Sequence, residues 1–269
     1  MNRPAVRVMG SGLLFLALLG AWRPALADNP APACPLGREH GGLEFPVESL
    51  SAEARCLISG VVENATTQGV TGPVVTPIAR PLYEFLLDRP PLTAGLATQL
   101  ELAPYECAVT DQKRFWINDH DGTQGQFMFL FQDATSRIYH VDGFHEGRIV
   151  PRVKARAAVF LRVKEVRTPE GEPAVESTLV TYTKLNDPML AFLVRLLRPL
   201  VSGAVTRKLS KGFDVVNQLS AMAAREPDRF LSEVLASGPI GQEAARALRP
   251  LLTQTVLAVP PHAPSPSKP

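Results

Sequence analysis

The residues best suited to metal binding or proton transfer lie near the middle of the chain, at His140, Asp142, His145 and Glu146. On a strand, His140 and Asp142 would share one face because they are two residues apart, and His145 would reach back from the turn. Imidazole and carboxylate groups are ligands that zinc accepts. We favour the simpler interpretation, a polar strand end whose side chains hydrogen-bond locally, and predict neither a metal nor a cofactor.

Other patterns of catalytic residues are weak in this sequence. Gly122-Thr123-Gln124-Gly125 lacks the spacing and the Lys-Ser/Thr pair of a phosphate loop, and Asp119-His120-Asp121-Gly122 has the composition of a turn. No Gly-x-Ser-x-Gly segment marks a hydrolase nucleophile. A glycosidase-like carboxylate pair would come from distant segments, so the sequence leaves it open. We predict that the protein is not an enzyme; the weaker alternative is a metal-dependent enzyme centred on His140 and Asp142.

The first 27 residues have the three parts of a cleavable secretory signal peptide. Arg3 and Arg7 form a basic start, residues 13–22 are apolar, and Ala25-Leu26-Ala27 is a cleavage site. The apolar stretch is too short for a transmembrane helix, which takes about 20 residues. We therefore predict cleavage after Ala27 and a periplasmic or secreted mature protein. A lipidated Cys34 is the less favoured alternative.

Removing the signal peptide changes the charge of the protein. The full chain has 28 basic and 26 acidic residues, and three arginines but no acids leave with the signal, so the mature net charge is about −1. The basic residues do not form a dense run with interleaved aromatic residues, as on nucleic-acid-binding surfaces. We predict no nucleic-acid partner.

Three cysteines, Cys34, Cys56 and Cys107, remain in the mature chain. Disulfides persist in exported proteins, and three cysteines allow one disulfide and one thiol. A Cys34–Cys56 bond would hold the N-terminal leader to a predicted helix, but all three pairings stay open.

The first part of the mature chain is expected to be helical. Helical periodicity begins at Ser49 or Ser51, either of which can cap a helix. Residues 69–77 interrupt this pattern. Further helices are expected over 78–87 and 92–100.

From Tyr105 the hydrophobic period changes to two, which predicts strands. We expect six of them: Tyr105–Thr110, Arg114–Asn118, Gln126–Gln132, Arg137–Phe144, Arg152–Val166 and Ala174–Leu185. The short polar connections favour hairpins and an antiparallel sheet. Alternation within 152–166 predicts one buried and one largely solvated face, and Phe127, Phe129 and Phe131 are expected to share a face.

After the strands, Asn186-Asp187-Pro188 provides a helix cap and a proline suited to the first turn. The apolar stripe that follows predicts a helix of about 35 residues, bent near Pro199 and Gly203. Leu190–Val201 could also lie on a bilayer surface, but we favour burial under the sheet. We divide the mature chain into an irregular leader, 28–48, a ligand-binding domain, 49–238, a C-terminal helix, 239–259, and a disordered tail, 260–269.

This order of elements, a strand meander followed by Asn186-Asp187-Pro188-Met189-Leu190 and a long helix, resembles the helix-grip family over about residues 80–235. The family includes the StAR-related lipid-transfer domains and the pollen-allergen-like proteins. It usually opens with a strand, and the candidate here is a short strand near 42–47. The resemblance implies an α+β fold in which a curved antiparallel sheet of about six strands grips the long C-terminal helix, with added N- and C-terminal helices.

The resemblance also implies an apolar cavity between sheet and helix, which relatives use for sterols, phospholipids or other hydrophobic molecules. We therefore predict a binding or transport protein for a lipid or other hydrophobic small molecule, with transient contact to a membrane surface. The residues expected to contact the ligand are Phe127, Phe129, Phe131, Val159, Leu161, Leu179, Leu193, Leu197 and Leu200. The alternative is an envelope scaffold in which these residues only pack against one another and the terminal helices bind a protein partner.

Overall fold

The computed structural model of the chain describes residues 34–111, 113–147, 152–188 and 198–258, with only the backbone described for 198–209 and 254–258. The predicted signal peptide and C-terminal tail lie outside these residues, and so does the stretch 189–197 of the predicted long helix. None of the described helices is long and apolar enough to span a membrane.

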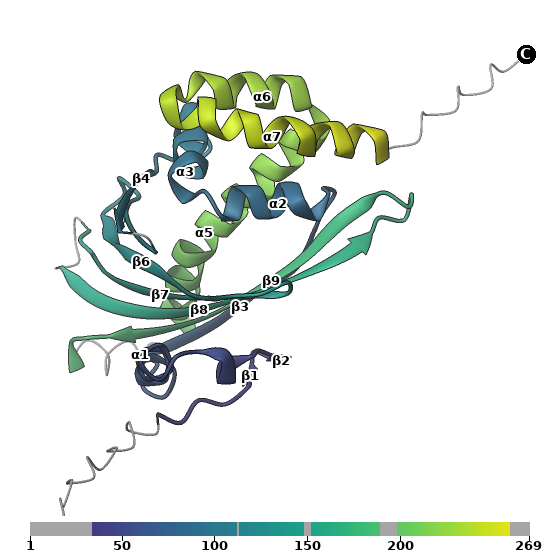
Figure 1. The fold of residues 1–269 in the computed structure, drawn as a ribbon. Helices are drawn as coiled ribbons and strands as arrows, with labels where there is room; N and C mark the ends of the chain where they lie inside the picture. The colour runs from purple at the N-terminus through teal and green to yellow at the C-terminus, as the bar shows by residue number, and fades with distance from the viewer. Residues whose placement is uncertain (1–33, 112, 148–151, 189–197, 259–269) are drawn as a thin grey trace, which may run out of the picture. The chain divides into compact units, whose positions relative to one another are not determined.

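The main sheet has seven antiparallel strands in the order β3-β9-β8-β7-β6-β5-β4 (Figure 1). They are β3 (Thr67–Thr76), β4 (Glu106–Asp111), β5 (Arg114–Asn118), β6 (Thr123–Gln132), β7 (Ser136–His145), β8 (Val153–Arg167) and β9 (Pro173–Leu185). The six strands expected from the period-two pattern correspond to β4 to β9. The α+β class and the antiparallel meander are therefore confirmed.

The seventh strand, β3, contradicts the expectation that residues 69–77 only interrupt a helical region. Its threonines and valines are β-branched and favour extended backbone, and it pairs with β9 along its length. The pairing shifts register around Gly72-Pro73, where proline has no N–H to donate. Gly72 has φ 113° and a Cβ there would lie 2.7 Å from the Ser177 carbonyl oxygen, so the position requires glycine.

The convex face of the sheet is covered by α1 (Ala52–Val62) and by a small hairpin of β1 (Glu39–His40) and β2 (Leu43–Glu44) (Figure 1). The Ser51 hydroxyl accepts a hydrogen bond from the Ala54 N–H at 3.1 Å, which caps α1 as the sequence predicts. The hairpin includes part of the segment 42–47, where an opening strand was expected, but it does not join the main sheet.

The other described helices lie on the concave side of the sheet (Figure 1). They are α2 (Arg80–Leu87), α3 (Pro90–Gln99), α5 (Arg198–Arg225), α6 (Pro227–Ala236) and α7 (Gly238–Ala258). The helices expected over 78–87 and 92–100 are confirmed within two residues, as α2 and α3. From residue 198 onward, α5 also confirms the helical state of the predicted long helix.

Two hydrophobic clusters fill opposite sides of the sheet. The concave-side cluster joins α2, α3, α5, α6 and α7 to β8 and β9, and the convex-side cluster joins α1 to β7, β8 and β9. In the middle of β8, Leu161 is buried on the concave side while Ala158 and Phe160 are buried on the convex side. The prediction of a largely solvated face is wrong for this middle section because α1 and its leader cover it.

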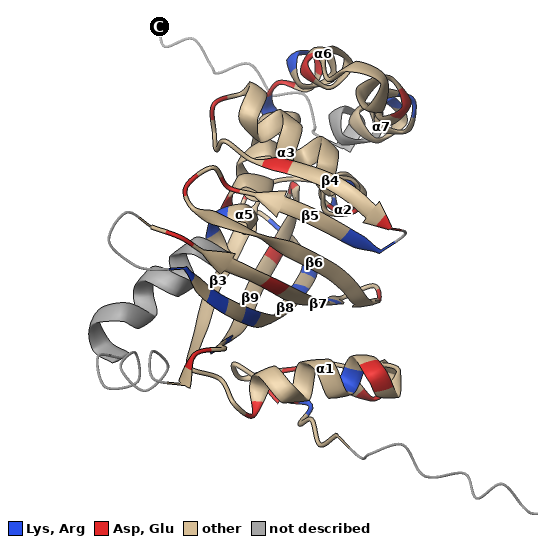
Figure 2. Cartoon of the chain, turned by 90° about the vertical axis from the view of Figure 1, so that its left-hand side faces the viewer, with Lys and Arg blue, Asp and Glu red and all other residues tan. Residues whose placement is uncertain are grey.

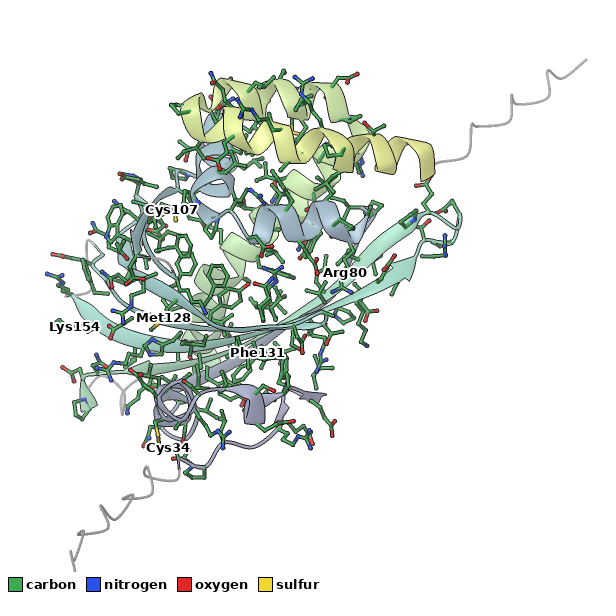
Figure 3. All side chains as sticks on the ribbon, in the orientation of Figure 1. Cys34, Arg80, Cys107, Met128, Phe131 and Lys154 are labelled. Atoms are coloured by element: carbon green, nitrogen blue, oxygen red, sulfur yellow. A yellow bond between two sulfur atoms is a disulfide. The ribbon has the colours of Figure 1, made fainter. Side chains whose placement is uncertain are left out.

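Strand β6 changes face between Phe129 and Phe131. Phe129 is opposite Tyr139 but Phe131 is opposite Ile138, so β6 carries an extra residue at this point. The bulge turns Phe131 to the convex-side cluster, on the side of the sheet that α1 covers (Figure 3). The expectation that Phe131 shares a face with Phe127 and Phe129 is wrong, because the period-two rule fails at a bulge.

Candidate functional site

A row of aromatic side chains crosses the concave face of the sheet on β5, β6 and β7. Phe115 stacks on Phe127 with ring centroids 5.1 Å apart and meets Phe129 edge-on at 5.4 Å. Tyr139 tilts against Phe129 at 5.0 Å. The strand register explains these contacts because Phe115 is opposite Phe127, and Phe129 is opposite Tyr139. We call these four residues the aromatic row.

The aromatic row is only partly covered by the rest of the protein. Phe127, Phe129 and Tyr139 each keep part of their surface accessible, and so does Val159 beside them. Leu161 and Leu179, farther along the same face, are buried in the concave-side cluster. The concave face therefore has a packed half, under α2 and α5, and a half that offers partly exposed apolar rings.

The structure brings together five of the nine residues predicted to contact a ligand: Phe127, Phe129, Val159, Leu161 and Leu179. Packing alone accounts for Leu161 and Leu179, which lie in the packed half. Phe131 is on the opposite face. Leu193 and Leu197 lie outside the described residues, and the side chain of Leu200 is not described.

Phe115 and Tyr139 complete the aromatic row, although the sequence prediction did not include them. Both lie in strands that the period-two pattern predicts. The missing information was the register between neighbouring strands, which decides which residues share a face across a sheet.

A buried polar group lies in the packed half, between α2, α5 and the sheet. Asn217 Oδ1 accepts hydrogen bonds from the Tyr83 hydroxyl at 3.1 Å and from the Thr76 hydroxyl at 3.2 Å. Tyr83 is fully buried, and burial raises its pKa to about 12, partly opposed by a hydrogen bond with Ser177 and by the Arg137 charge. Tyr83 therefore stays protonated and links α2 to α5.

Arg137 is a buried cation next to the aromatic row, with 2% of its surface exposed. Its Nη1 donates to the carboxylate of Asp88 at the C-terminal end of α2, whereas its Nη2 has no hydrogen-bond partner among the described residues. Burial raises the pKa of Tyr139, and the nearby Arg137 charge opposes that shift. Because an unpaired buried charge is strongly destabilising, the ion pair fixes the end of α2 to β7.

The residues of the metal-site alternative do not converge. His140 and Asp142 lie on the convex side of β7, whereas His145 lies on the concave side, with Nδ1 3.1 Å from Thr123 Oγ1. Among the described residues, no group of three or more His, Cys, Asp or Glu side chains could hold a metal ion.

Of the three cysteine pairings that the sequence leaves open, the structure contains one. Cys34 and Cys56 form a disulfide with Cα atoms 4.9 Å apart, which ties the leader to α1. Such a bond agrees with an oxidising compartment. Cys107 is a free thiol whose pKa is raised to about 12 by burial, so it is a weak nucleophile at neutral pH.

Comparisons with known proteins leave the function open. No protein-family model matches the chain, and no curated protein matches it. Among solved structures, a conserved protein from Geobacillus kaustophilus is similar with a TM-score of 0.40 and 10% identity, covering 58% of this chain and 95% of that chain. A likeness at this level supports no conclusion about function.

Proposed function

We propose that the protein is an exported binding or transport protein for a lipid or another hydrophobic small molecule, held between the concave face of the sheet and the long C-terminal helix. The observation that carries this proposal is the partly exposed aromatic row. When an apolar ligand covers such accessible rings, the surface removed from water contributes about 25 cal/mol of favourable binding free energy per Å².

The order of the elements supports the helix-grip resemblance. β3 precedes the short helices α2 and α3, so it supplies the opening strand that the family usually has. It pairs with β9, the strand that leads to the long helix. Phe213, Val216 and Leu219 of α5 are buried with Leu161 and Leu179 in the concave-side cluster. In this proposal the ligand lies between the aromatic row and the N-terminal part of α5.

Export to the periplasm or out of the cell is part of the proposal. It rests on the signal pattern in residues 1–27 and on the Cys34–Cys56 disulfide. In such a compartment an apolar molecule needs a carrier to cross water, and transient contact with a membrane surface would load or release it.

Two phenylalanines on one strand provide a matched test. Phe129 belongs to the aromatic row, whereas Phe131 packs on the other side of β6. We expect the mature protein to bind a fluorescent fatty acid, dansyl-undecanoic acid, in a fluorescence titration. Phe129→Ala should raise its Kd about tenfold, because losing an aromatic contact and its buried area costs about 1.4 kcal/mol.

The control is Phe131→Ala, which should leave the Kd within about twofold because the two sites are separated by the sheet. Wild-type protein that shows no saturable binding would rule the proposal out. Equal effects of the two substitutions on the Kd would count against the concave face as the binding site.

A further inference from the structure

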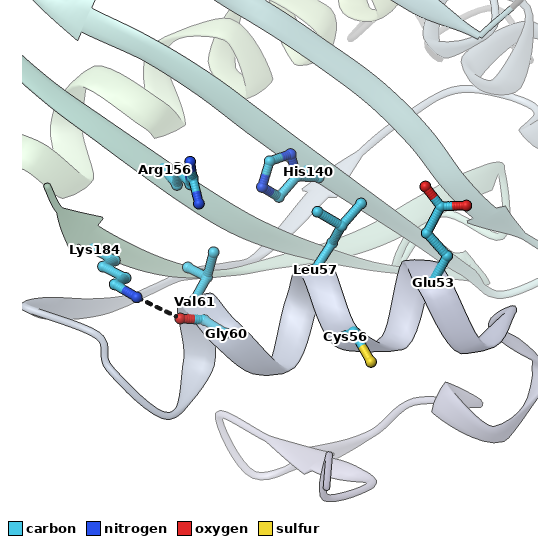
Figure 4. Close-up of a pocket in the computed structure, with 8 residues that line it drawn as sticks. All are labelled: Glu53, Cys56, Leu57, Gly60, Val61, His140, Arg156 and Lys184. Carbon is cyan, nitrogen blue, oxygen red and sulfur yellow. Dashed lines mark hydrogen bonds between the residues drawn. The ribbon is translucent and has the colours of Figure 1, made fainter. Parts of the chain in front are cut away.

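A second candidate site lies on the opposite face of the sheet, where α1 crosses β7, β8 and β9. A cleft of about 280 Å³ opens there between α1 and the strands (Figure 4). Its lining residues are Glu53, Cys56, Leu57, Gly60, Val61, His140, Arg156 and Lys184. The volume is near the lower end of the range of small-molecule pockets, so a ligand of this cleft is small.

His140 forms the floor of the cleft. The residue is 6% exposed, and its Nε2 is buried without a hydrogen-bond partner among the described residues. Burial lowers the pKa of His140. The negative charge of Asp142 opposes this shift, and the positive charge of Arg156 adds to it. The imidazole is therefore neutral at neutral pH, and a buried ring nitrogen without a partner is destabilising unless a ligand or water satisfies it.

Two cations stand at one end of the cleft. Arg156 and Lys184 are opposite each other on β8 and β9, and Figure 2 shows basic segments on the strands above α1. Arg156 Nε donates to Asp142 Oδ2 at 3.1 Å. Lys184 Nζ donates to the Gly60 carbonyl oxygen at 3.1 Å (Figure 4). Among the described residues Lys184 has no ion-pair partner, so its positive charge is available to an anion.

The rest of the cleft is apolar until its far end. Leu57 and Val61 of α1 line it between the cations and Glu53. Glu53 precedes Gly60 by seven residues, which corresponds to about 10 Å along a helix. The cleft thus has positive charge at one end, negative charge at the other, and an apolar wall between them.

We infer that this cleft binds a small monocarboxylate with an apolar body. Its carboxylate lies beside Lys184 and Arg156 and accepts a hydrogen bond from Nε2 of His140, while its body packs against Leu57 and Val61. Glu53 repels a second carboxylate at the far end, so dicarboxylates of similar length bind less well. This site is separate from the proposed lipid site, because the sheet lies between them.

Benzoate is a suitable probe in isothermal titration calorimetry with the mature protein. We expect wild-type protein to bind benzoate and to bind the uncharged methyl benzoate at least about tenfold more weakly, since a charge-assisted hydrogen bond is lost. Lys184→Gln and Arg156→Gln should each weaken benzoate binding about tenfold. The matched control is Lys164→Gln, because Lys164 is on the same strand as Arg156 but outside the cleft. This substitution should leave the affinity for benzoate unchanged.

A gain of binding makes the test independent of folding defects. Terephthalate, a dicarboxylate, should bind wild-type protein more weakly than benzoate, and Glu53→Gln should strengthen terephthalate binding about tenfold by removing the repulsion. The inference is overturned if benzoate shows no saturable binding, or if inorganic phosphate displaces it with equal affinity. It is also overturned if Phe129→Ala, rather than Lys184→Gln, abolishes benzoate binding, because benzoate would then occupy the aromatic row.

Discussion

His40 is a buried imidazole beneath the convex face of the sheet. It is 3% exposed and stacks on Phe160 with ring centroids 4.0 Å apart. Its Nδ1 lies 3.2 Å from the Tyr182 hydroxyl oxygen, and its Nε2 has no hydrogen-bond partner among the described residues. Burial lowers the pKa of His40, partly opposed by a hydrogen bond with the Gly37 backbone. The folded protein therefore holds this ring in its neutral form.

A pH dependence of stability follows from His40. The unfolded state takes up a proton below about pH 6.5, its usual pKa, while the folded state resists protonation. The contribution of His40 to stability is therefore present above pH 6.5 and is lost as the pH falls toward the lowered pKa of the folded state. The unfolding free energy of the wild-type protein should fall between pH 7.5 and pH 5.5. In His40→Phe this fall should be smaller by about 1 kcal/mol, as measured by urea denaturation at the two pH values.

The control for this experiment is Tyr182→Phe, which keeps the buried imidazole and should keep the wild-type pH dependence. An unchanged pH dependence in His40→Phe would show that His40 does not titrate differently in the folded and unfolded states. His140, whose pKa burial also lowers, accounts for part of the dependence that remains in His40→Phe.

Residue by residue, the aromatic row could be predicted only in part. Alternation within one strand is enough to place Phe127 and Phe129 on one face. Phe115 and Tyr139 join them through pairing with neighbouring strands, which alternation within a strand does not reveal. Phe131 leaves the row because of a bulge that no residue type marks.

At the scale of the elements, strands with a nearby partner were predictable and β3 was not. β4 to β9 follow one another in the chain at short sequence separations and show clear alternation, so local sequence specifies them. β3 contains Gly69, Gly72 and Pro73, which locally favour a break. Its partner, β9, is about a hundred residues away in the chain, and this long-range pairing overrides the local preference.

The attachment of α1 to the leader can be tested through its disulfide. The Cys34–Cys56 bond spans a sequence separation of 22 residues, and constraining an unfolded loop of this length is worth about 3 kcal/mol. The double substitution Cys34→Ser with Cys56→Ser should lower the unfolding free energy by this amount in urea denaturation. α1 covers the convex-side cluster, so its amide protons should also exchange faster.

Cys107→Ala is the matched control, because it removes a cysteine that forms no disulfide. It should change the unfolding free energy by no more than about 1 kcal/mol. A double variant as stable as the wild-type protein would mean that α1 and the leader are held by packing alone.

At the scale of the whole molecule, one sheet supports two different surfaces. The concave side combines a packed half with the partly exposed aromatic row, and the convex side holds α1 over a small cleft with charged ends and an apolar wall. The α+β class and the antiparallel meander could be predicted, because they depend on periodicity and turn residues. The accessibility of the rings could not, because the same apolar residues suit a filled core and an open one.

The most direct test of the central claim is to extract the purified mature protein with organic solvent and identify the extract by lipid mass spectrometry. The protein should be extracted both as purified and after incubation with phospholipid vesicles and re-isolation. We predict a stoichiometric amount of a lipid or another apolar molecule in at least one of the two extracts. Extracts that contain no such molecule, before and after incubation, would contradict the proposed binding function.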